Sequence, residues 1–355
     1  MALMTKASKN NKRSTGKRPS MKDVADLAGV SRTTVSFVLN KKPDANIPLE
    51  TQEKVWMAVK DLGYRPNAVA RNLRAQSTNT IGFISDEIAT TPFAVRILQG
   101  AQNQAWENKK LLLTVNTGRD SDIRDAAVNM LLERQVDGII YATMYHREVH
   151  PPEQIREVPT VLLDCFVADK SLPSVVPDEV KGGYEATKLL LEKGHKQVAF
   201  ICESQPVPAK FGRMIGYKKA LAEFGIAYDE SLVSFYPCIQ ANGRKAAAEL
   251  FSRADYPSAV FCYNDRLAMG LYDGLRELGL SIPKDVAVVG FDDQDLIAAD
   301  IQPGLTTMAL PHYEMGQWAV SHLLELINNK NNNVIDSNQP VQHLLPCPLI
   351  KRNSA

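Results

Sequence analysis

Short polar and acidic residues follow several apolar runs in this sequence of 355 residues. They are Ser85-Asp86, Asp164, Glu203, Asn264-Asp265 and Asp292-Asp293. Each carboxylate accepts hydrogen bonds at both oxygens, so such residues suit a ligand with many hydroxyl groups. A few fixed polar groups among apolar and aromatic walls are the usual construction of a small-molecule pocket. The first chemistry that these residues indicate is therefore the binding of a small polar molecule.

Motifs for catalysis or metal binding are weak by comparison. His146 and His150 are four residues apart, but two prolines follow them and the first histidine lacks the adjacent glutamate of zinc proteases, so we predict a loop there. His195 follows Gly194 at a helix end, which favours a capping role. The sequence holds no phosphate loop, dinucleotide fingerprint or nucleophile elbow. We therefore predict that the protein is not an enzyme and that it holds neither a metal ion nor a cofactor.

The cysteines and the apolar runs indicate a cytoplasmic protein. The 5 cysteines are odd in number and far apart, as expected for reduced thiols. No apolar run approaches the roughly 20 residues that span a bilayer. The basic N-terminus lacks the apolar core of a secretory signal. We expect no membrane partner.

Alternating apolar runs and amphipathic segments would position the polar residues. The runs that resemble strands are Ile81–Ile84, Leu111–Val115, Gly138–Tyr141, Thr160–Leu163, Val198–Ile201, Ala259–Cys262 and Val286–Val289. The helical segments between them include Pro92–Asn108, Ile123–Gln135, Gly183–Glu192, Phe211–Phe224 and Arg266–Leu278. Short buried strands with long crossovers predict parallel sheets covered by helices. Ligands of such sheets bind beyond the carboxyl ends of the strands, where the polar residues lie.

The N-terminal part carries a different charge from the rest. Residues 1–79 hold 15 Lys and Arg against 6 Asp and Glu, although the whole chain has a net charge of only +1. A basic segment on an acidic body is typical of a protein that binds nucleic acid through one part. Much of this charge lies in residues 1–19, so a solvated basic tail is the alternative.

Two short helices around a glycine turn are predicted near the N-terminus. Ser20 and Asp23 fit a capping box, in which a side chain and a backbone amide satisfy each other reciprocally. Val24, Leu27 and Ala28 then fall on one helix face. These residues predict a first helix with an apolar face toward a small core.

A second and a third helix complete this unit. Gly29 allows a turn, and Ser31 can cap a helix that runs to about Leu39. A third helix from about Leu49 to Leu62 closes the core. The pattern is a helix-turn-helix, whose second helix enters the major groove of DNA.

Two segments resemble the headpiece of the lactose-repressor (LacI/GalR) family. They are Met21–Asn40 (MKDVADLAGVSRTTVSFVLN) and Gly63–Leu73 (GYRPNAVARNL), and the resemblance continues in register to about Lys351. It implies a sequence-specific, DNA-binding transcriptional regulator, most simply a repressor, that is controlled by a small-molecule effector. The implied fold is an all-α helix-turn-helix headpiece followed by an α/β core of two lobes, like that of periplasmic binding proteins, with parallel sheets flanked by helices.

The resemblance also implies a division into domains. We expect a basic tail at 1–19, the helix-turn-helix domain at 20–66, a hinge helix and linker at 67–79, and the effector-binding and dimerisation domain at 80–351. Lobe 1 would span about 80–176 and 309–330, and lobe 2 about 177–308. Pro173–Asp178 and Leu305–Leu310 resemble crossings between the lobes.

The family's DNA contacts fall on named residues of this sequence. The base-reading positions are Arg32, Thr33 and Phe37, of which Phe37 departs from the arginine of better-known members. The positions that contact phosphate are Ser31, Ser36, Asn40, Thr51, Tyr64, Arg71 and Arg74. For Ser31 a role as helix cap is the alternative.

Residues 67–75 are too short to hold an isolated helix in water. The resemblance implies a hinge helix that folds on DNA beside its twin from a second subunit. Leu73 matches the leucine that wedges between base pairs from the minor groove. The alternative is a linker with an ordinary exposed leucine. We expect a homodimer on double-stranded operator DNA.

The family's effector contacts fall on Asp164, Arg213, Asn264 and Asp292, with Phe93 as a stacking wall. For each of them a cap or turn role is the alternative. Asp86–Phe93 resembles a subgroup associated with sugar uptake, which favours a sugar effector. A purine-like corepressor, a phosphoprotein partner, and a cytoplasmic or periplasmic sugar-binding protein are the other candidates.

Overall fold

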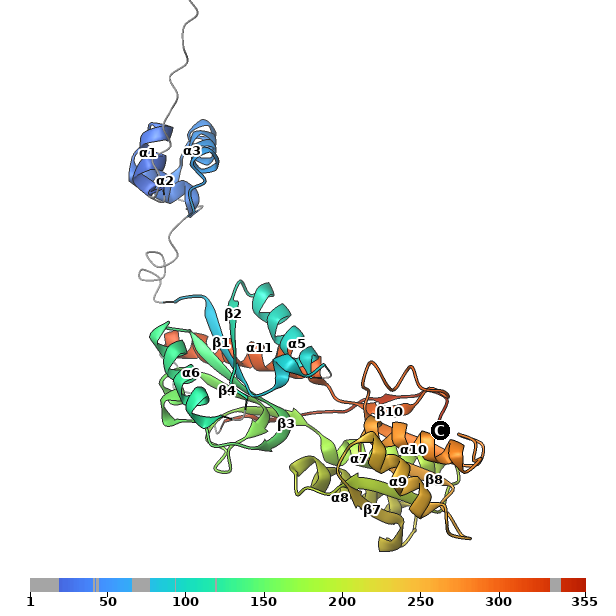
Figure 1. Ribbon diagram of the computed structural model, residues 1–355. Helices are drawn as coiled ribbons and strands as arrows, with labels where there is room; N and C mark the ends of the chain where they lie inside the picture. Colours follow the sequence, from blue (N-terminus) through green and yellow to red (C-terminus); the bar gives the residue numbers. More distant parts are fainter. Residues whose placement is uncertain are drawn as a thin grey trace, which may run out of the picture. The chain divides into compact units, whose positions relative to one another are not determined.

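The computed structural model describes residues 19–40, 42, 45–65, 77–92, 94–118, 120–332 and 340–355 (Figure 1). The chain forms two compact units, Met1–Thr78 and Asn79–Ala355, which are described separately. The predicted hinge helix with Arg71, Leu73 and Arg74 lies outside the described residues, as does Phe93.

The first unit contains the three predicted helices, α1 (Met21–Ala28), α2 (Arg32–Leu39) and α3 (Leu49–Leu62). The capping box is confirmed, because Ser20 Oγ accepts a hydrogen bond from the Asp23 amide at 3.3 Å and the Ser20 amide donates to Asp23 Oδ2 at 2.7 Å. Gly29 ends α1 with a φ of 66°, a conformation that glycine adopts without strain. These local signals place α2 where the sequence predicted it.

The core of this unit is small and apolar. Its buried residues are Val24, Ala25, Val35, Val38, Val55, Ala58 and Tyr64. The prediction for Leu27 was wrong, because Leu27 is 56% exposed and Ala25 is buried. The buried stripe of α1 runs through positions 21, 24, 25 and 28, so Leu27 lies outside it.

Lobe 1 of the second unit is a parallel sheet covered by helices. Its strand order is β11-β5-β4-β3-β1-β2. The strands are β1 (Thr80–Ser85), β2 (Leu111–Asn116), β3 (Gly138–Glu148), β4 (Thr160–Phe166), β5 (Ser174–Pro177) and β11 (Gln342–Leu345). The helices are α5 (Val95–Glu107), α6 (Ser121–Glu133) and α11 (His312–Asn331), with 3-10 turns at Ile88–Thr90 and Glu153–Glu157.

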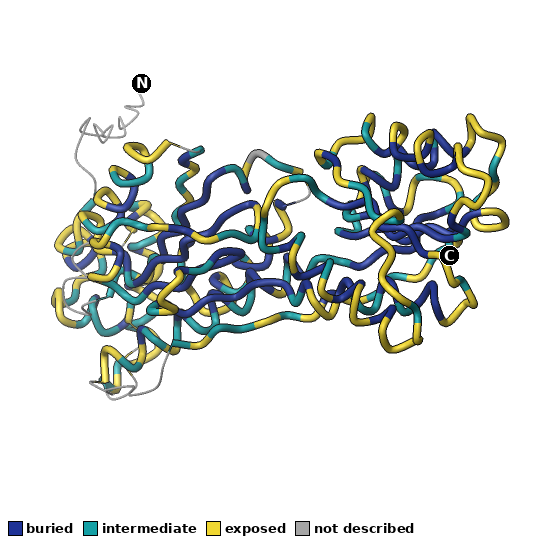
Figure 2. Tube along the Cα trace, turned by 90° about the horizontal axis from the view of Figure 1, so that it is seen from below, coloured by how far each residue is buried: buried dark blue, intermediate teal, exposed yellow. Residues whose placement is uncertain are grey.

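Lobe 2 repeats this construction. Its strand order is β12-β10-β9-β8-β6-β7, and all neighbours pair in parallel except β12 with β10. The strands are β6 (Val198–Glu203), β7 (Val233–Tyr236), β8 (Ala259–Cys262), β9 (Ala287–Asp292), β10 (Thr306–Ala309) and β12 (Leu349–Ile350). The helices are α7 (Glu179–Glu192), α8 (Pro208–Glu223), α9 (Gln240–Leu250) and α10 (Asp265–Glu277), with a 3-10 turn at Glu230–Leu232. Figure 2 shows buried segments through the interior of both lobes, whereas the edge strands β2, β7, β11 and β12 are only partly buried.

The chain crosses between the lobes three times. Crossings follow β5 and β10, where the sequence placed them, and a third connects β11 to β12. The sequence assigned only 177–308 to lobe 2, whereas the structure adds a C-terminal segment, because the Val288 amide donates to the Ser354 carbonyl at 2.8 Å and Ser354 is buried. A two-residue strand carries too little periodicity to be detected in a sequence.

Candidate functional site

The predicted polar residues lie at the carboxyl ends of strands in both lobes. Asp164 lies near the end of β4, Asn264 follows β8, and Asp292 ends β9. Asp164 and Asp292 have positive φ angles of 56° and 107°, which non-glycine residues rarely adopt. Such backbone strain is concentrated at ligand-binding sites.

Arg213 of α8 reaches this site from within lobe 2, where its side chain is only 3% exposed. Its Nε donates to Glu179 Oε2 at 2.7 Å, and its Nη1 donates to the Tyr263 carbonyl. Its Nη2 lies 3.8 Å from Asp292 Oδ1. Arg213 therefore connects α7, the end of β8 and the end of β9.

Two aromatic rings hold the guanidinium of Arg213. Its Cζ lies 3.5 Å from the ring centroid of Phe291 and 4.3 Å from that of Tyr263. Burial alone would lower the pKa of Arg213, but the charge of Glu179, then Tyr263 and Asp292, raises it. Arg213 stays charged, and a cation over aromatic faces is further stabilised by their quadrupoles.

Asp164 contributes from lobe 1 a carboxyl group that is 3% exposed. Within the described residues its Oδ1 is buried without a hydrogen-bond partner. Burial raises the pKa of Asp164 well above its usual range, and the charges of Glu179, Asp86 and Asp292 raise it further, against Arg213. Asp164 is thus within electrostatic reach of the cluster in lobe 2, and an unsatisfied buried oxygen is a place for a ligand atom.

Asp292 and Asn264 already have hydrogen-bond partners within the protein for part of their polar atoms. Burial raises the pKa of Asp292 to about 6, although Arg213 and a hydrogen bond from Gln294 act to lower it. Gln294 Nε2 donates to Asp292 Oδ2 at 3.0 Å. Asn264 caps α10, because its Oδ1 accepts from the Leu267 amide at 2.9 Å. Its Nδ2 group is therefore its candidate contact with a ligand.

Two further acids belong to this site, Glu179 and Asp86, of which only Glu179 was not singled out from the sequence. Glu179 carries no pattern of its own, since its partner Arg213 is 34 residues away. Asp86 Oδ1 accepts from the Met144 amide at 2.9 Å and its Oδ2 accepts from Arg147 Nη2 at 2.8 Å. Only Asp86 had a signal, its place at the end of a strand.

His146 corrects the prediction of a loop. It lies in β3, which runs from Gly138 to Glu148, beyond the apolar run seen in the sequence. Its ring meets Phe166 edge-on with centroids 5.6 Å apart. Burial lowers the pKa of His146, and the nearby charges of Glu179 and Arg213 act on it in opposite directions. The polar end of β3 escaped detection because it has no apolar alternation.

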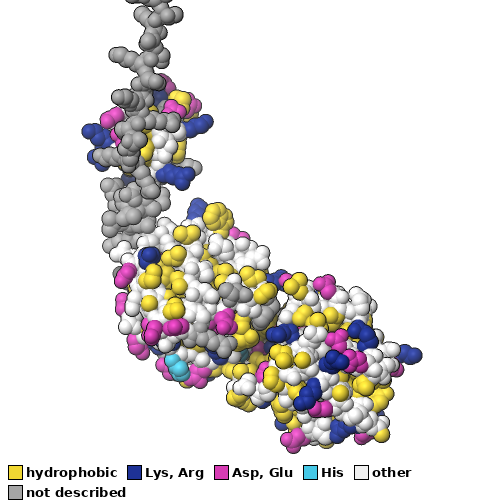
Figure 3. All heavy atoms as spheres, in the orientation of Figure 1, with side chains coloured by type: hydrophobic (Ala, Val, Ile, Leu, Met, Phe, Trp, Pro, Cys, Tyr) yellow, Lys and Arg dark blue, Asp and Glu magenta, His cyan; other side chains and the backbone are white. Residues whose placement is uncertain are grey.

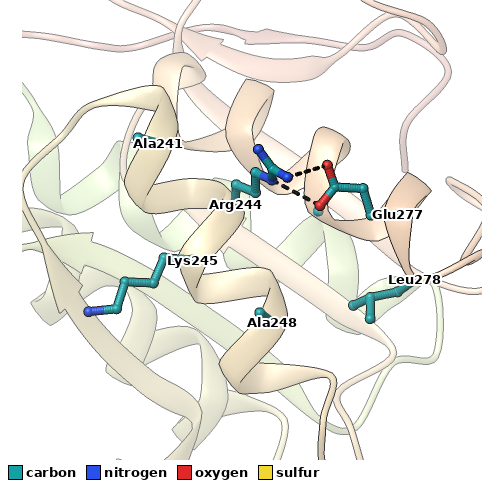
Figure 4. A pocket seen from close by; sticks show the side chains of 7 residues that line it. Ala241, Arg244, Lys245, Ala248, Glu277 and Leu278 are labelled. Carbon is teal, nitrogen blue, oxygen red and sulfur yellow. Dashed lines mark hydrogen bonds and ion pairs between the residues drawn. The ribbon is translucent and has the colours of Figure 1, made fainter.

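Two cavities help to locate the site. A cavity of about 90 Å³ lies at the strand ends of lobe 1 and is lined in part by Ser85, Asp86, Thr117, Tyr141 and Arg147. A larger one of about 320 Å³ lies over α9 and α10, where Arg244 and Glu277 form an ion pair of 2.8 Å (Figure 4). We assign the site to the strand ends because Ser85 and Asp86 line the smaller cavity there, although none of the predicted effector contacts Asp164, Arg213, Asn264 and Asp292 lines either cavity.

The base-reading candidates of the first unit lie on α2. Arg32 and Thr33 are exposed and Phe37 is half-buried. Lys42 Nζ lies 5.2 Å from the Phe37 ring centroid. Figure 3 shows Lys and Arg side chains projecting from this unit. Their contacts with DNA remain predictions.

The phosphate-contact candidates have structural partners as well. Ser31 caps α2, since its Oγ accepts from the Thr34 amide at 3.0 Å. Asn40 Nδ2 donates to the Ser36 carbonyl at 2.7 Å. Thr51 is half-buried, and Tyr64 packs its ring into the core with 8% exposure. Tyr64 thus has a packing role that the sequence did not reveal.

Two absences hold for the described residues, 19–40, 42, 45–65, 77–92, 94–118, 120–332 and 340–355. No helix there is long and apolar enough to cross a membrane. In the same ranges, no group of three or more His, Cys, Asp or Glu side chains is placed to hold a metal ion.

Comparisons with known proteins cover nearly the whole chain. Residues 78–353 match the model of periplasmic binding proteins and the sugar-binding domain of the LacI family, and residues 20–67 match the model of bacterial regulatory proteins of the lacI family. The HTH-type transcriptional repressor PurR of Vibrio atlanticus (strain LGP32) is 36% identical over 318 residues, which are 88% of this chain and 93% of the relative.

Two solved structures are similar in fold. The lac repressor dimer bound to operator and the anti-inducer ONPF has a TM-score of 0.77 and 26% identity, and covers 95% of this chain and 99% of that chain. The complex of the transcriptional regulator CelR with cellobiose has a TM-score of 0.65 and 30% identity, and covers 95% and 100%. The predicted fold class is confirmed, and the chain belongs to the LacI family of bacterial regulatory proteins.

Proposed function

We propose that this transcriptional regulator is a repressor that binds operator DNA through α2 and binds a sugar at Asp164, Arg213, Asn264 and Asp292. The observation that carries the proposal is the buried, unsatisfied Oδ1 of Asp164 within reach of the charged cluster around Arg213. The likeness to an operator-bound repressor dimer and to a cellobiose complex supports both halves.

A sugar suits the site better than a purine-like corepressor. Asp292 offers a hydrogen-bond acceptor and Asn264 a donor. The carboxyl of Asp164 accepts hydrogen bonds and, when protonated, also donates one, so the set matches a ligand with several hydroxyl groups. A purine is bound best between aromatic faces. The rings of Phe291 and Tyr263 are already occupied by the guanidinium of Arg213.

The remaining parts of the proposal rest on the family. Residues 67–75 would form the hinge helix, with Leu73 in the minor groove and Arg71 and Arg74 on flanking phosphates. Two headpieces in a homodimer would read paired half-sites. We propose a cytoplasmic protein divided at residues 19, 66 and 79 as the sequence indicates, with no catalytic role and no cofactor.

A ligand screen tests the effector assignment. Ligands that bind only the folded state raise the melting temperature in proportion to RT ln(1+[L]/Kd). We expect a neutral sugar, with cellobiose and ribose among the first probes, to raise the melting temperature and to change operator affinity. A nucleobase that stabilises the protein while no sugar does so would reject the sugar assignment. Absence of sequence-selective DNA binding would reject the repressor assignment.

A further inference from the structure

The hydrogen-bonding fork of Arg213 is already occupied. Glu179 accepts from its Nε at 2.7 Å and from its Nη2 at 3.4 Å, and the Tyr263 carbonyl accepts from its Nη1. A guanidinium has five N–H groups, and the paired ones on its edge are those that bind a carboxylate or phosphate in a bidentate way. In this protein Glu179 takes the place of such an anion.

Two acidic side chains offset the positive charge of Arg213. Glu179 pairs with Arg213, and Asp292 Oδ1 lies 3.8 Å from its Nη2. Arg147, a second cation near the strand ends, is bound to Asp86 at 2.8 Å, and Arg266 of α10 acts on Asp292. An anionic ligand at Arg213 would therefore meet the negative charges of Glu179 and Asp292, which disfavour its binding.

Glu179 is held in place by the packing of α7 against α8. It is the first residue of α7, and its side chain is only 5% exposed. A Cβ added at Gly212 would lie 2.5 Å from the Cβ of Glu179, and one at Gly183 would collide with the backbone of Arg213. These two glycines bring the helices close enough for the ion pair and leave Glu179 little room to move aside.

We propose that Glu179 determines the specificity of the effector site: by occupying the fork of Arg213, it makes the site accept neutral polyhydroxy ligands and reject their anionic analogues, such as sugar phosphates and sugar acids. The inference rests on the proposed effector site. In this arrangement Glu179 fills the edge of Arg213 formed by Nε and Nη2, so an anionic ligand cannot bind there in a bidentate way. The positive charge of Arg213 is balanced by Glu179 and Asp292 within the protein.

Replacing Glu179→Gln tests the inference without a known effector. The variant keeps the shape of the side chain and removes its charge, which leaves Arg213 free to bind an anion. With inorganic phosphate as the probe, we expect saturable thermal stabilisation of E179Q at concentrations at least about tenfold lower than any response of the wild type. The double variant E179Q/R213Q should lose this gain. The matched control is E192Q on the same helix. Glu192 is exposed and pairs with Lys188, so this variant should behave as the wild type.

A second measurement covers the case in which E179Q does not fold. E179D keeps the charge and should exclude phosphate as the wild type does. The inference would be overturned if the wild type bound phosphate and R213Q abolished that binding. It would also be overturned if E179Q folded and gained no phosphate affinity. The proposed function fails separately, through absence of sugar or operator binding, because the phosphate titration uses neither.

Discussion

Asp164 and Asp292 are both acids of the proposed effector site, yet their surroundings give them different acid–base properties. Asp164 lies among carboxylates with one unsatisfied oxygen, and burial raises its pKa well above the usual range. Asp292 faces Arg213 and accepts from Gln294, so its pKa rises only to about 6. Burial thus favours the protonated form of Asp164, whereas Asp292, with a pKa of about 6, should be ionised at neutral pH.

This difference predicts unequal effects of the same substitution. Asp164→Asn puts a neutral amide in place of a carboxyl group whose protonated form is favoured by burial, and should reduce sugar affinity by less than about 1 kcal/mol. Asp292→Asn removes a charged acceptor and should cost about 1.5–3 kcal/mol. Calorimetric titration of both variants with the sugar found in the screen measures the two losses. Equal losses would show that Asp164 is also ionised.

The raised pKa of Asp292 predicts a dependence on pH. Below about pH 6 the carboxyl of Asp292 takes up a proton and loses acceptor capacity, so sugar affinity should fall between pH 7 and pH 5. The effect of pH on folding stability has the opposite sign. Because folding raises the pKa of Asp292, its ionised carboxyl destabilises the fold above pH 6. This penalty disappears as the pH falls toward the pKa that the carboxyl has in the unfolded chain. Titrations across this range compare the wild type with D292N, whose affinity should not show this step.

At the scale of single elements, short helices depend on their caps. The helix α2 begins at Arg32 after Ser31, and the Ser31 hydroxyl satisfies the Thr34 amide. Because α2 has only 8 residues, a lost cap removes a large share of its stabilisation. The same hydroxyl is the predicted phosphate contact, so the cap and the contact must be separated by experiment.

Two substitutions of Ser31 separate these roles. Ser31→Ala should destabilise the first unit by about 0.5–2 kcal/mol. Ser31→Asp should retain the cap, because aspartate is an equally good N-cap, but should weaken DNA binding by placing a negative charge against phosphate. Thermal unfolding and operator affinity are measured for both variants. If S31D bound operator as tightly as the wild type, Ser31 would be a cap only.

At the scale of the whole molecule, regulation requires that a ligand at the lobes changes the hold on DNA. A ligand shifts such an equilibrium only through its different affinities for two arrangements, typically by about 1–3 kcal/mol of coupling. The chain crosses between the lobes three times, and Glu179 lies immediately after one crossing while it binds Arg213. A ligand at Arg213 thus acts close to a connection between the lobes.

The hinge supplies the other end of this coupling. From the resemblance to the family, Leu73→Ala should weaken operator binding because a smaller side chain cannot wedge open the base step. The headpiece and the core should keep their unfolding temperatures. Operator affinity and DNA bending are measured together, and a stable L73A that still bends DNA fully would contradict the wedge.

The sequence by itself determined the local elements and the family of this protein. Helix caps such as Ser20 and Ser31, the glycine turn, and the alternation of apolar runs with helices act over a few residues, so they can be read along the chain. They placed α2, the parallel sheets covered by helices and the polar strand ends where Asp164 and Asp292 lie, and the resemblance to the family divided the sheets between two lobes. Motif spacing then sufficed to name the DNA-binding unit.

Only the tertiary structure decided which charged side chains of the site pair with one another. The pairs Glu179–Arg213 and Asp86–Arg147 join residues 34 and 61 positions apart, and no short-range pattern specifies such partners. The pKa of Asp164 depends on charges that both lobes bring together. Burial and charge act through space rather than along the chain, which is why Arg213 was identified from the sequence and its occupied fork was not.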